Sequence, residues 1–379
     1  MRPVALAMMP PLVPLTTVTD VTNTLLNNRM VCVGDLSAGS TAAMRMVALR
    51  SLGFDIQAID SSVGRIRPLS QPLEYLAIKA RRPLDTRRIN QQILNAVGPC
   101  SVLYIDKGVT IRSTTLAKVR AAFPHVRIIG YSPDDMLNRN MSSAYFPGTL
   151  PLYHTYLTTK SYGVQELLDL GCPQVLFVEN AYDPDTHRPL PPASSPIFSC
   201  AVGFIGTYEP DRAAILKRLA LAGIPVTIRG NLWRPLQWQA IAGLSFLPEV
   251  IGDEYSRAIC STRINLAFLR KSNRDLQTTR SIEIPACAGF MLAERTAEHE
   301  ALFREGVEAE YFAGFDELVQ KIKKTLADEP QRKAIALAGR TRCLRDDYTY
   351  AGRFRTAFQT LGIPLPGSQP STPLAVPSE

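Results

Sequence analysis

The stretch Arg29-Met-Val-Cys-Val-Gly34-Asp35, followed by Leu36-Ser-Ala-Gly39-Ser-Thr-Ala-Ala-Met-Arg45, decides the fold of this chain. The apolar run is typical of a buried strand that ends in a glycine turn, and the second segment opens a helix that runs to about Leu52. Gly53 ends that helix, and residues 54–60 read as the next strand. A strand, a glycine-rich turn, a helix and a strand within about 30 residues predict a βαβ unit.

The same alternation continues along the chain and restarts after a proline-rich segment at residues 187–197. Before that segment, strands are expected at 101–106, 126–131, 153–158 and 174–178, and helices at 115–123 and 164–170. After it, strands are expected at 200–206, 225–229, 264–268 and 290–292, and helices at 211–222, 315–327, 331–345 and 350–361. Residues 61–100 carry no clear pattern.

These patterns predict an α/β protein with two Rossmann-like domains that face each other across a cleft. The expected order is an N-terminal extension (1–28), a first domain (29–186), a proline-rich linker (187–197), a second domain (198–362) and a disordered tail (363–379). Open α/β sheets bind ligands at the carboxyl ends of their strands, so the loops that follow strands are the candidate binding segments.

The composition indicates an anionic partner. The 379 residues are 46% hydrophobic, which is enough for two cores, and the formal net charge is +8. Such a charge suits nucleic acid, a membrane surface or a phosphorylated substrate. The basic residues form no long block and aromatic residues make up only 8%, so we expect no nucleic-acid partner.

The sequence also favours a cytoplasmic location. The seven scattered cysteines include no CxxC pair, and with only four histidines they give no zinc pattern, so they are expected as small buried residues in a reducing compartment. Four prolines interrupt the apolar start of the chain, which argues against a signal peptide. We find no apolar run of membrane-spanning length and expect, at most, peripheral membrane contact.

The segment from Asp275 to Glu294 is the strongest functional signal. Asp275 and Glu283 are separated by seven residues, and Arg280 lies three positions before Glu283. Pro285 fits best in the first turn of a helix, so Glu283 is expected at the helix N-terminus, where free N–H groups attract phosphate. A carboxylate for sugar hydroxyls beside an anion site would suit a nucleotide sugar. The alternative is a short core-packing helix with one capping carboxylate.

This pattern resembles the carboxylate–seven–carboxylate element of glycosyltransferases with the GT-B fold, with Asp275 in place of the usual first glutamate. Three C-terminal segments resemble the glycosyltransferase module of CgeB-like (spore maturation protein-like) proteins: 280–294, 310–318 and 347–354. The resemblance covers roughly residues 198–356. It is weaker in the N-terminal half, at residues 104–108 and 131–136.

The resemblance implies that Glu283 binds the ribose of a nucleotide and that Asp275 approaches the donor sugar as a catalytic residue. Asp275 is one methylene shorter than glutamate, which reduces its reach. Arg280 would pair with the diphosphate through its bidentate guanidinium.

Other residues are assigned to the same donor site. Gly206 and Arg212 follow the first strand of the second domain and resemble the family's donor-facing turn, with Arg212 near phosphate; the alternative is a solvated helix residue. Trp233 is expected to flank the base or to lie in the core. Gly289, the last glycine of the segment from Asp275 to Glu294, is also assigned to the donor site.

In the first domain, Asp134 and Asp135 follow a strand where an acceptor and a catalytic base would be expected. Repulsion between neighbouring carboxylates raises a pKa, which suits a general base; the alternative is an Asx turn or helix cap after Pro133. Lys107 and Lys160 are candidates for the acceptor side or are surface lysines. His187 is expected to be structural.

We therefore expect a glycosyltransferase that moves a sugar from a nucleotide-diphosphate sugar to the hydroxyl of a saccharide, protein or lipid-linked acceptor. Asp134-Asp135 is not the Asp-x-Asp motif of metal-dependent transferases, so we expect no metal and no cofactor beyond the donor, with basic side chains stabilising the departing diphosphate. The alternative is a non-catalytic carbohydrate- or nucleotide-binding protein on the same fold.

Overall fold

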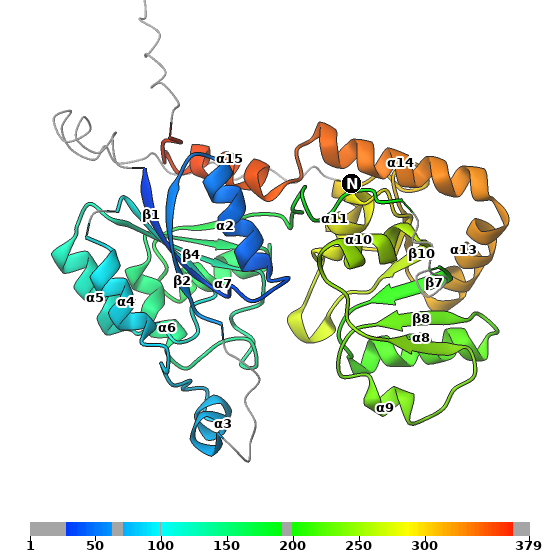
Figure 1. Cartoon of the computed structure of the whole chain (residues 1–379), viewed down its shortest axis with the longest axis horizontal. Coiled ribbons are helices and arrows are strands. Elements are labelled where there is room, and N and C mark those ends of the chain that lie inside the picture. The colour runs from blue at the N-terminus through cyan, green and yellow to red at the C-terminus, as the bar shows by residue number, and fades with distance from the viewer. Residues whose placement is uncertain (1–27, 63–70, 99, 192–198, 367–379) are drawn as a thin grey trace, which may run out of the picture.

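A computed structural model describes residues 28–62, 71–98, 100–191 and 199–366. The chain forms two α/β domains that lie side by side, each built on a six-stranded parallel sheet (Figure 1). The expectations for the extension at 1–27, for the linker from 192 and for the tail from 367 fall outside the described residues.

The N-terminal sheet has the order β2-β1-β3-β4-β5-β6. Its strands are β1 (Arg29–Gly34), β2 (Asp55–Asp60), β3 (Val102–Asp106), β4 (Arg127–Ser132), β5 (Thr155–Thr158) and β6 (Val175–Phe177). The connecting helices are α2 (Thr41–Ser51), α3 (Pro72–Lys79), α4 (Ile89–Ala96), α5 (Ser113–Ala122), α6 (Phe146–Thr149), the 3-10 helix η1 (Leu150–Leu152) and α7 (Gly163–Asp169).

The continuous apolar run of β1 follows from burial of both faces of the sheet. Val31 and Val33 belong to a core shared with α4 and α5, whereas Met30 and Cys32 belong to a core shared with α2. Successive strand residues point to opposite faces, so a strand covered on both sides needs apolar residues throughout.

The C-terminal sheet has the order β12-β11-β10-β7-β8-β9. Its strands are β7 (Cys200–Ile205), β8 (Val226–Arg229), β9 (Leu244–Leu247), β10 (Thr262–Ala267), β11 (Met291–Glu294) and β12 (Glu310–Phe312). Its helices are α8 (Pro210–Leu221), α9 (Arg234–Gln237), α10 (Gly252–Cys260), the 3-10 helix η3 (Lys271–Asn273), α11 (Arg280–Ala286), α12 (Ala297–Leu302), α13 (Phe315–Ala327) and α14 (Glu329–Arg345).

The last helix, α15 (Tyr350–Thr360), returns to the N-terminal domain (Figure 1). Phe354 packs edge-on against Tyr104, and Phe358 packs edge-on against Phe54. The second domain was expected to extend to residue 362, but this helix completes the helical layer over one face of the N-terminal sheet.

The expectation of two Rossmann-like domains is confirmed. The strands and helices predicted from the alternation are present within a few residues. The strands β9 and β12 and the helices α3, α4, α6, α9, α10 and α12 were not anticipated. All seven cysteines are free, and five are buried. In the described part of the chain, no helix combines the length and apolar content that a membrane span requires.

Candidate functional site

A cavity of about 310 Å³ lies between the domains, outside the carboxyl ends of β7 and β10. These neighbouring strands mark the point where the strand order of the C-terminal sheet reverses, which is where open α/β sheets bind ligands. The C-terminal domain contributes residues 204–207, Arg212, 267–268, Arg270, Asn273, Asp275 and 278–280. The N-terminal domain contributes Thr41, Pro133, Asp134, Lys160 and Asn180.

Arg212 ties together the two loops that follow β7 and β10. Its guanidinium donates to the carbonyl oxygens of Thr207 (3.2 Å), Phe268 (3.1 Å) and Leu269 (3.2 Å). These bonds use three of the five N–H groups of the side chain, which leaves two for a ligand in the cavity. Arg212 is only 8% exposed, so it is not a solvated helix residue.

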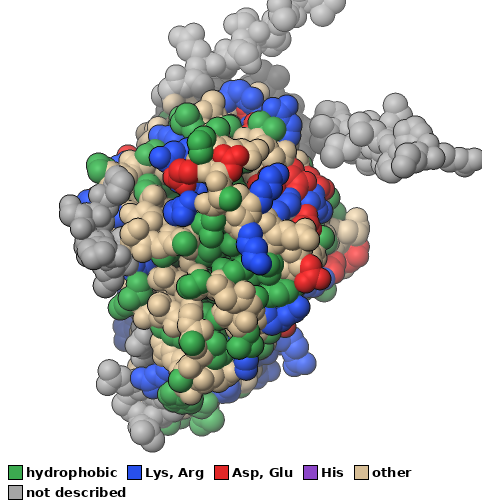
Figure 2. Space-filling view, turned by 90° about the vertical axis from the view of Figure 1, so that its right-hand side faces the viewer, with side chains coloured by type: hydrophobic (Ala, Val, Ile, Leu, Met, Phe, Trp, Pro, Cys, Tyr) green, Lys and Arg blue, Asp and Glu red, His purple; other side chains and the backbone are tan. Residues whose placement is uncertain are grey.

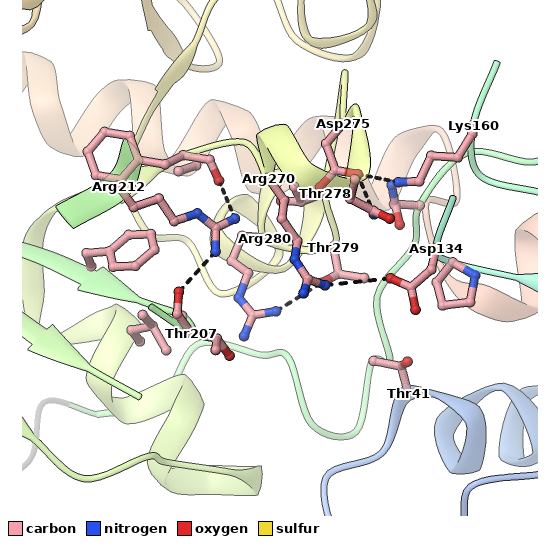
Figure 3. A pocket seen from close by; sticks show the side chains of 18 residues that line it. Thr41, Asp134, Lys160, Thr207, Arg212, Arg270, Asp275, Thr278, Thr279 and Arg280 are labelled. Carbon is pink, nitrogen blue, oxygen red and sulfur yellow. Dashed lines mark hydrogen bonds and ion pairs between the residues drawn. The ribbon is translucent and has the colours of Figure 1, made fainter. Parts of the chain in front are cut away.

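Two further arginines converge on Arg212 (Figure 3). Arg270 donates from Nε to Glu209 at 2.6 Å, and Arg280 donates from Nη1 to the hydroxyl of Thr279 at 3.2 Å. The buried Nε of Arg280 has no partner among the described residues. Burial, and with it the charges of Arg280 and Arg270, lowers the pKa of Arg212. Three guanidinium groups around so small a space favour an anion with several oxygens.

Asp275 closes the cavity on the N-terminal side, where it meets Lys160. The Lys160 ammonium lies 2.5 Å from Oδ1 of Asp275, and Asn273 donates to the same oxygen at 2.8 Å. Burial raises the pKa of Asp275, although Lys160 and Asn273 act in the opposite direction. Lys160 is therefore not a surface lysine, because its side chain is 4% exposed.

The adjacent carboxylates Asp134 and Asp135 point to different places. Asp134 lines the cavity, where Lys107 lies 2.6 Å from Oδ2 and Arg270 lies 3.8 Å from Oδ1. Asp135 is buried away from it, accepts from Nε of Arg274 at 2.7 Å and caps the N–H of Leu137 at 3.0 Å.

The pKa of Asp134 is shifted in the direction opposite to the one expected of a general base. Burial alone would raise the pKa of Asp134, but the charge and hydrogen bond of Lys107, with Arg270 and Lys160, bring it below its usual value. Cation partners outweigh the repulsion between neighbouring carboxylates because they approach the Asp134 oxygens directly.

A second, larger cavity of about 800 Å³ lies in the N-terminal domain, at the carboxyl ends of β1 and β3. Three residues line both cavities: Thr41, Pro133 and Asp134. Asp134 therefore stands where the two cavities meet, one lined mainly by the C-terminal domain and one by the N-terminal domain.

The start of α11 differs from the sequence prediction. The helix begins at Arg280, so Thr279 and Arg280 lie at its N-terminus, Glu283 is the fourth residue and Pro285 lies inside the helix. Glu283 is 3% exposed and is not among the residues that line the smaller cavity.

The Glu283 carboxylate is held by two side chains from other elements. The Tyr255 hydroxyl donates to Oε2 at 2.5 Å, and Nε2 of His187 lies 3.6 Å from Oε1. His187 also accepts a hydrogen bond from the N–H of Asp183 at 3.0 Å, which fits the structural role expected for it.

Of three other predicted donor-site residues, one lines the cavity and two pack in the protein interior. Gly206 lines the cavity, and its carbonyl accepts from Nε1 of Trp233 at 2.9 Å. Trp233 itself lies in the core against Phe204. Gly289 is a packing residue, because a Cβ there would lie 2.5 Å from a methyl group of Ile259.

Sequence reasoning missed Arg270 and the two threonines at the start of α11. Arg270 directly follows the strand predicted at 264–268, so the rule that ligands bind at strand carboxyl ends would have found it. Thr278 and Thr279 were hidden by the assignment of the helix start to Glu283. Among the described residues, no cluster of three or more His, Cys, Asp or Glu side chains could hold a metal ion.

Residues 212–359 match a family described as glycosyl transferase-like. A comparison with curated protein sequences gives no match. Among solved structures, the chain resembles Anabaena HepE in complex with UDP and glucose, with a TM-score of 0.58 at 12% identity. It also resembles an alpha-glucosyltransferase in complex with UDP-glucose and DNA containing an abasic site, with a TM-score of 0.63 at 12% identity.

A third similar structure is sucrose-phosphate synthase from Thermosynechococcus elongatus, with a TM-score of 0.56 at 11% identity. Each of the three alignments covers 88% of this chain and 99% of the other. The architecture is the GT-B fold that the resemblance implied. With this fold, and with residues 212–359 matched to a glycosyl transferase-like family, the protein is a glycosyltransferase.

Proposed function

We propose that the protein transfers a sugar from a nucleoside diphosphate sugar in the smaller cavity to a hydroxyl group of an acceptor in the larger one, without a metal ion. One observation carries the proposal: Arg212, Arg270 and Arg280 surround a cavity at the switch point of the C-terminal sheet. Four cationic and two carboxylate side chains line this cavity, so it has an excess of positive charge suited to a diphosphate.

In this proposal the bond between the sugar C1 and the diphosphate oxygen breaks, and its electron pair leaves with the diphosphate. Arg280, Arg270 and the two unused N–H groups of Arg212 stabilise the charge that develops there. The acceptor oxygen forms the new bond to C1. Asp134 accepts the hydrogen bond of that hydroxyl and takes its proton, because it alone of the carboxylates lines both cavities.

The other motif residues act on the donor. Asp275, oriented by Lys160 and Asn273, contacts the donor sugar. Glu283 contacts the ribose, as the resemblance of this motif implies; Arg280 of the same helix lines the cavity. We assign Asp135 to domain positioning, and we place the chain in the CgeB-like subfamily on the C-terminal motif.

The test is a thermal-shift panel of UDP, GDP, dTDP, ADP and CMP on the full chain. UDP is the first candidate, because HepE and the alpha-glucosyltransferase were solved with UDP or UDP-glucose. A nucleotide at about 100 times its Kd stabilises the folded state by roughly 2.7 kcal/mol. At about 2–4 °C per kcal/mol, the midpoint should rise by several degrees.

Arg280→Ala should weaken the nucleotide about 10- to 100-fold, because it removes charge-assisted hydrogen bonds worth roughly 1.5–3 kcal/mol each. Arg257→Ala is the matched control, since that side chain is 40% exposed and, among the described residues, forms an ion pair only with Asp253 at 3.9 Å. A cooperative wild-type transition that no nucleotide moves would refute the proposed donor site.

Turnover separates an enzyme from a binding protein on the same fold. With the nucleotide identified, the matching nucleotide sugar should be consumed in the presence of an acceptor, at a rate that EDTA leaves unchanged. Binding without consumption would favour the non-catalytic alternative. A rate restored only by added divalent ions would contradict metal independence.

A further inference from the structure

α3 projects from the N-terminal domain and buries none of its residues (Figure 1). Leu73 is 72% exposed and Leu76 is 61% exposed. With Ala77 and Ala80 they follow the spacing i, i+3, i+4, i+7, which places all four on one face of the helix. Such a contiguous apolar face on a protruding helix indicates an interaction surface.

Basic side chains accompany this apolar face. Lys79, Arg82 and Arg88 are exposed, and no ion pair to any of them is found in the described ranges. The nearest acidic side chain after the helix, Asp85, accepts hydrogen bonds from the N–H groups of Ile89 and Asn90. With Glu74 and Asp85 against five lysines and arginines, residues 72–88 carry an excess of positive charge.

Many basic side chains of the C-terminal domain have acidic partners. On the face that Figure 2 shows, basic and acidic side chains are interspersed. The ion pairs recorded in that domain include Lys321 with Glu305 at 2.5 Å and Arg332 with Glu329 at 2.6 Å. Residues 72–88 combine exposed leucines with basic side chains for which no ion pair is recorded in the described part of the chain.

We propose that residues 72–88 form a membrane-docking surface for bilayers that contain anionic lipid. Leu73 and Leu76 enter the interface, and Lys79, Arg82 and Arg88 contact the phosphate groups of the lipids. A two-turn helix with an apolar face and neighbouring basic residues lies in the plane of the interface and does not span it. The positive charge of these basic side chains complements the negative surface of an anionic bilayer, so we propose a bilayer of this kind as the partner.

Docking would also define the class of acceptor. Ile78 and Lys79, at the end of α3, and Arg81 line the larger cavity, so a docked helix holds that cavity beside the bilayer. This step rests on the proposed function. The acceptor hydroxyl then belongs to a membrane-embedded, lipid-linked molecule that enters the larger cavity from the bilayer surface.

The test is sedimentation of the full chain with vesicles of phosphatidylcholine, with and without phosphatidylglycerol as about a third of the lipid. We expect binding only to the anionic vesicles. Leu73→Glu combined with Leu76→Glu should weaken that binding at least about tenfold, because the apolar face becomes charged. Each of Lys79→Ala, Arg82→Ala and Arg88→Ala should weaken it about fivefold.

The matched control is Leu221→Glu combined with Leu337→Glu, which changes two leucines that are 70% and 63% exposed in the C-terminal domain. This variant should bind vesicles like the wild type. The nucleotide-induced thermal shift, measured on every variant, checks that the fold and donor site are intact. Vesicle binding that persists in a protein with no nucleotide response would refute the proposed function but not the docking surface.

Three outcomes would overturn the docking proposal. One is equal binding to both kinds of vesicle, with no effect of the basic substitutions. Another is an equal loss of binding in the control variant. The third is a soluble dimer that Leu73→Glu with Leu76→Glu dissociates, because the apolar face would then bind a second copy of the chain.

Discussion

Lys160 and Asp275 form a buried ion pair that joins the two domains, with Nζ 2.5 Å from Oδ1. Lys160 follows β5 of the N-terminal sheet, whereas Asp275 lies between η3 and α11 of the C-terminal domain. Nearby, Arg274 pairs with Asp135 at 2.7 Å, and the Tyr162 hydroxyl donates to the carbonyl of Asn273 at 2.8 Å. The N-terminal domain thus holds the segment that carries the first carboxylate of the donor motif.

Lys160→Met should destabilise the protein by about 3–5 kcal/mol at neutral pH, because it leaves the buried Asp275 carboxylate without its cation. Burial already raises the pKa of Asp275 in the folded state, and loss of Lys160 should raise it further. A raised folded-state pKa favours folding with the proton bound, so the penalty should shrink as pH falls and grow as it rises through that pKa.

Unfolding of the two proteins between about pH 4 and pH 8 measures this effect. The double variant Lys160→Met with Asp275→Leu is the control, since it removes both charges and should recover much of the stability lost by the single variant. A penalty for Lys160→Met that is the same at both ends of this pH range would contradict the proposed titration of Asp275.

Asp134→Asn should mainly reduce kcat, whereas Asp135→Asn should mainly reduce stability. Asp134 lines both cavities, so its replacement should reduce kcat about 10²- to 10⁴-fold while nucleotide binding persists. Asp135 pairs with Arg274 and caps Leu137, so its replacement should lower the thermal midpoint and reduce kcat much less. A larger loss of kcat for Asp135→Asn than for Asp134→Asn would reverse the assignment.

The sequence predicted the sheets well because their cause is local. β1 alternates between two cores, so its apolar run is continuous and easily recognised. The site was less predictable, because its contacts join residues far apart in the chain. Lys160 and Asp275 are 115 positions apart, and no local pattern indicates their pairing.

The start of α11 was mispredicted for a related reason. The rule that places proline in the first helical turn reflects a local preference, and Pro285 instead lies near the end of the helix. Ile282 and Ile284 are buried on this helix, so tertiary packing overrides the preference of the proline. Arg280 lines the smaller cavity, but its place at the helix N-terminus was not anticipated.

Gly289→Ala should lower stability and leave nucleotide binding intact. A Cβ at this position would lie 2.5 Å from Ile259 and 3.1 Å from the carbonyl oxygen of Ile284. Overpacking of this kind costs about 1–3 kcal/mol. Gly314→Ala is the control, because a Cβ there meets nothing within 4 Å. If Gly289→Ala lost UDP affinity without losing stability, the result would support the assignment of this glycine to the donor site.

Glu283→Gln tests the ribose contact through its dependence on the ligand hydroxyls. The substitution keeps the shape of the side chain but removes the charge that accepts from Tyr255 at 2.5 Å. If Glu283 accepts the ribose hydroxyls, UDP affinity should fall about tenfold, because hydrogen bonds to a charged group contribute roughly 1.5–3 kcal/mol.

The same substitution should have little effect on the affinity for 2′,3′-dideoxy-UDP, which lacks the hydroxyls. Comparing the two nucleotides on wild type and Glu283→Gln separates loss of the ribose contact from a general loosening of the site. Loosening would reduce the affinity for both nucleotides equally. Tyr255→Phe is the comparison variant, because it frees one carboxylate oxygen but keeps the charge of Glu283. Equal losses for the two nucleotides in Glu283→Gln would show that this carboxylate supports α11 and does not bind the ribose.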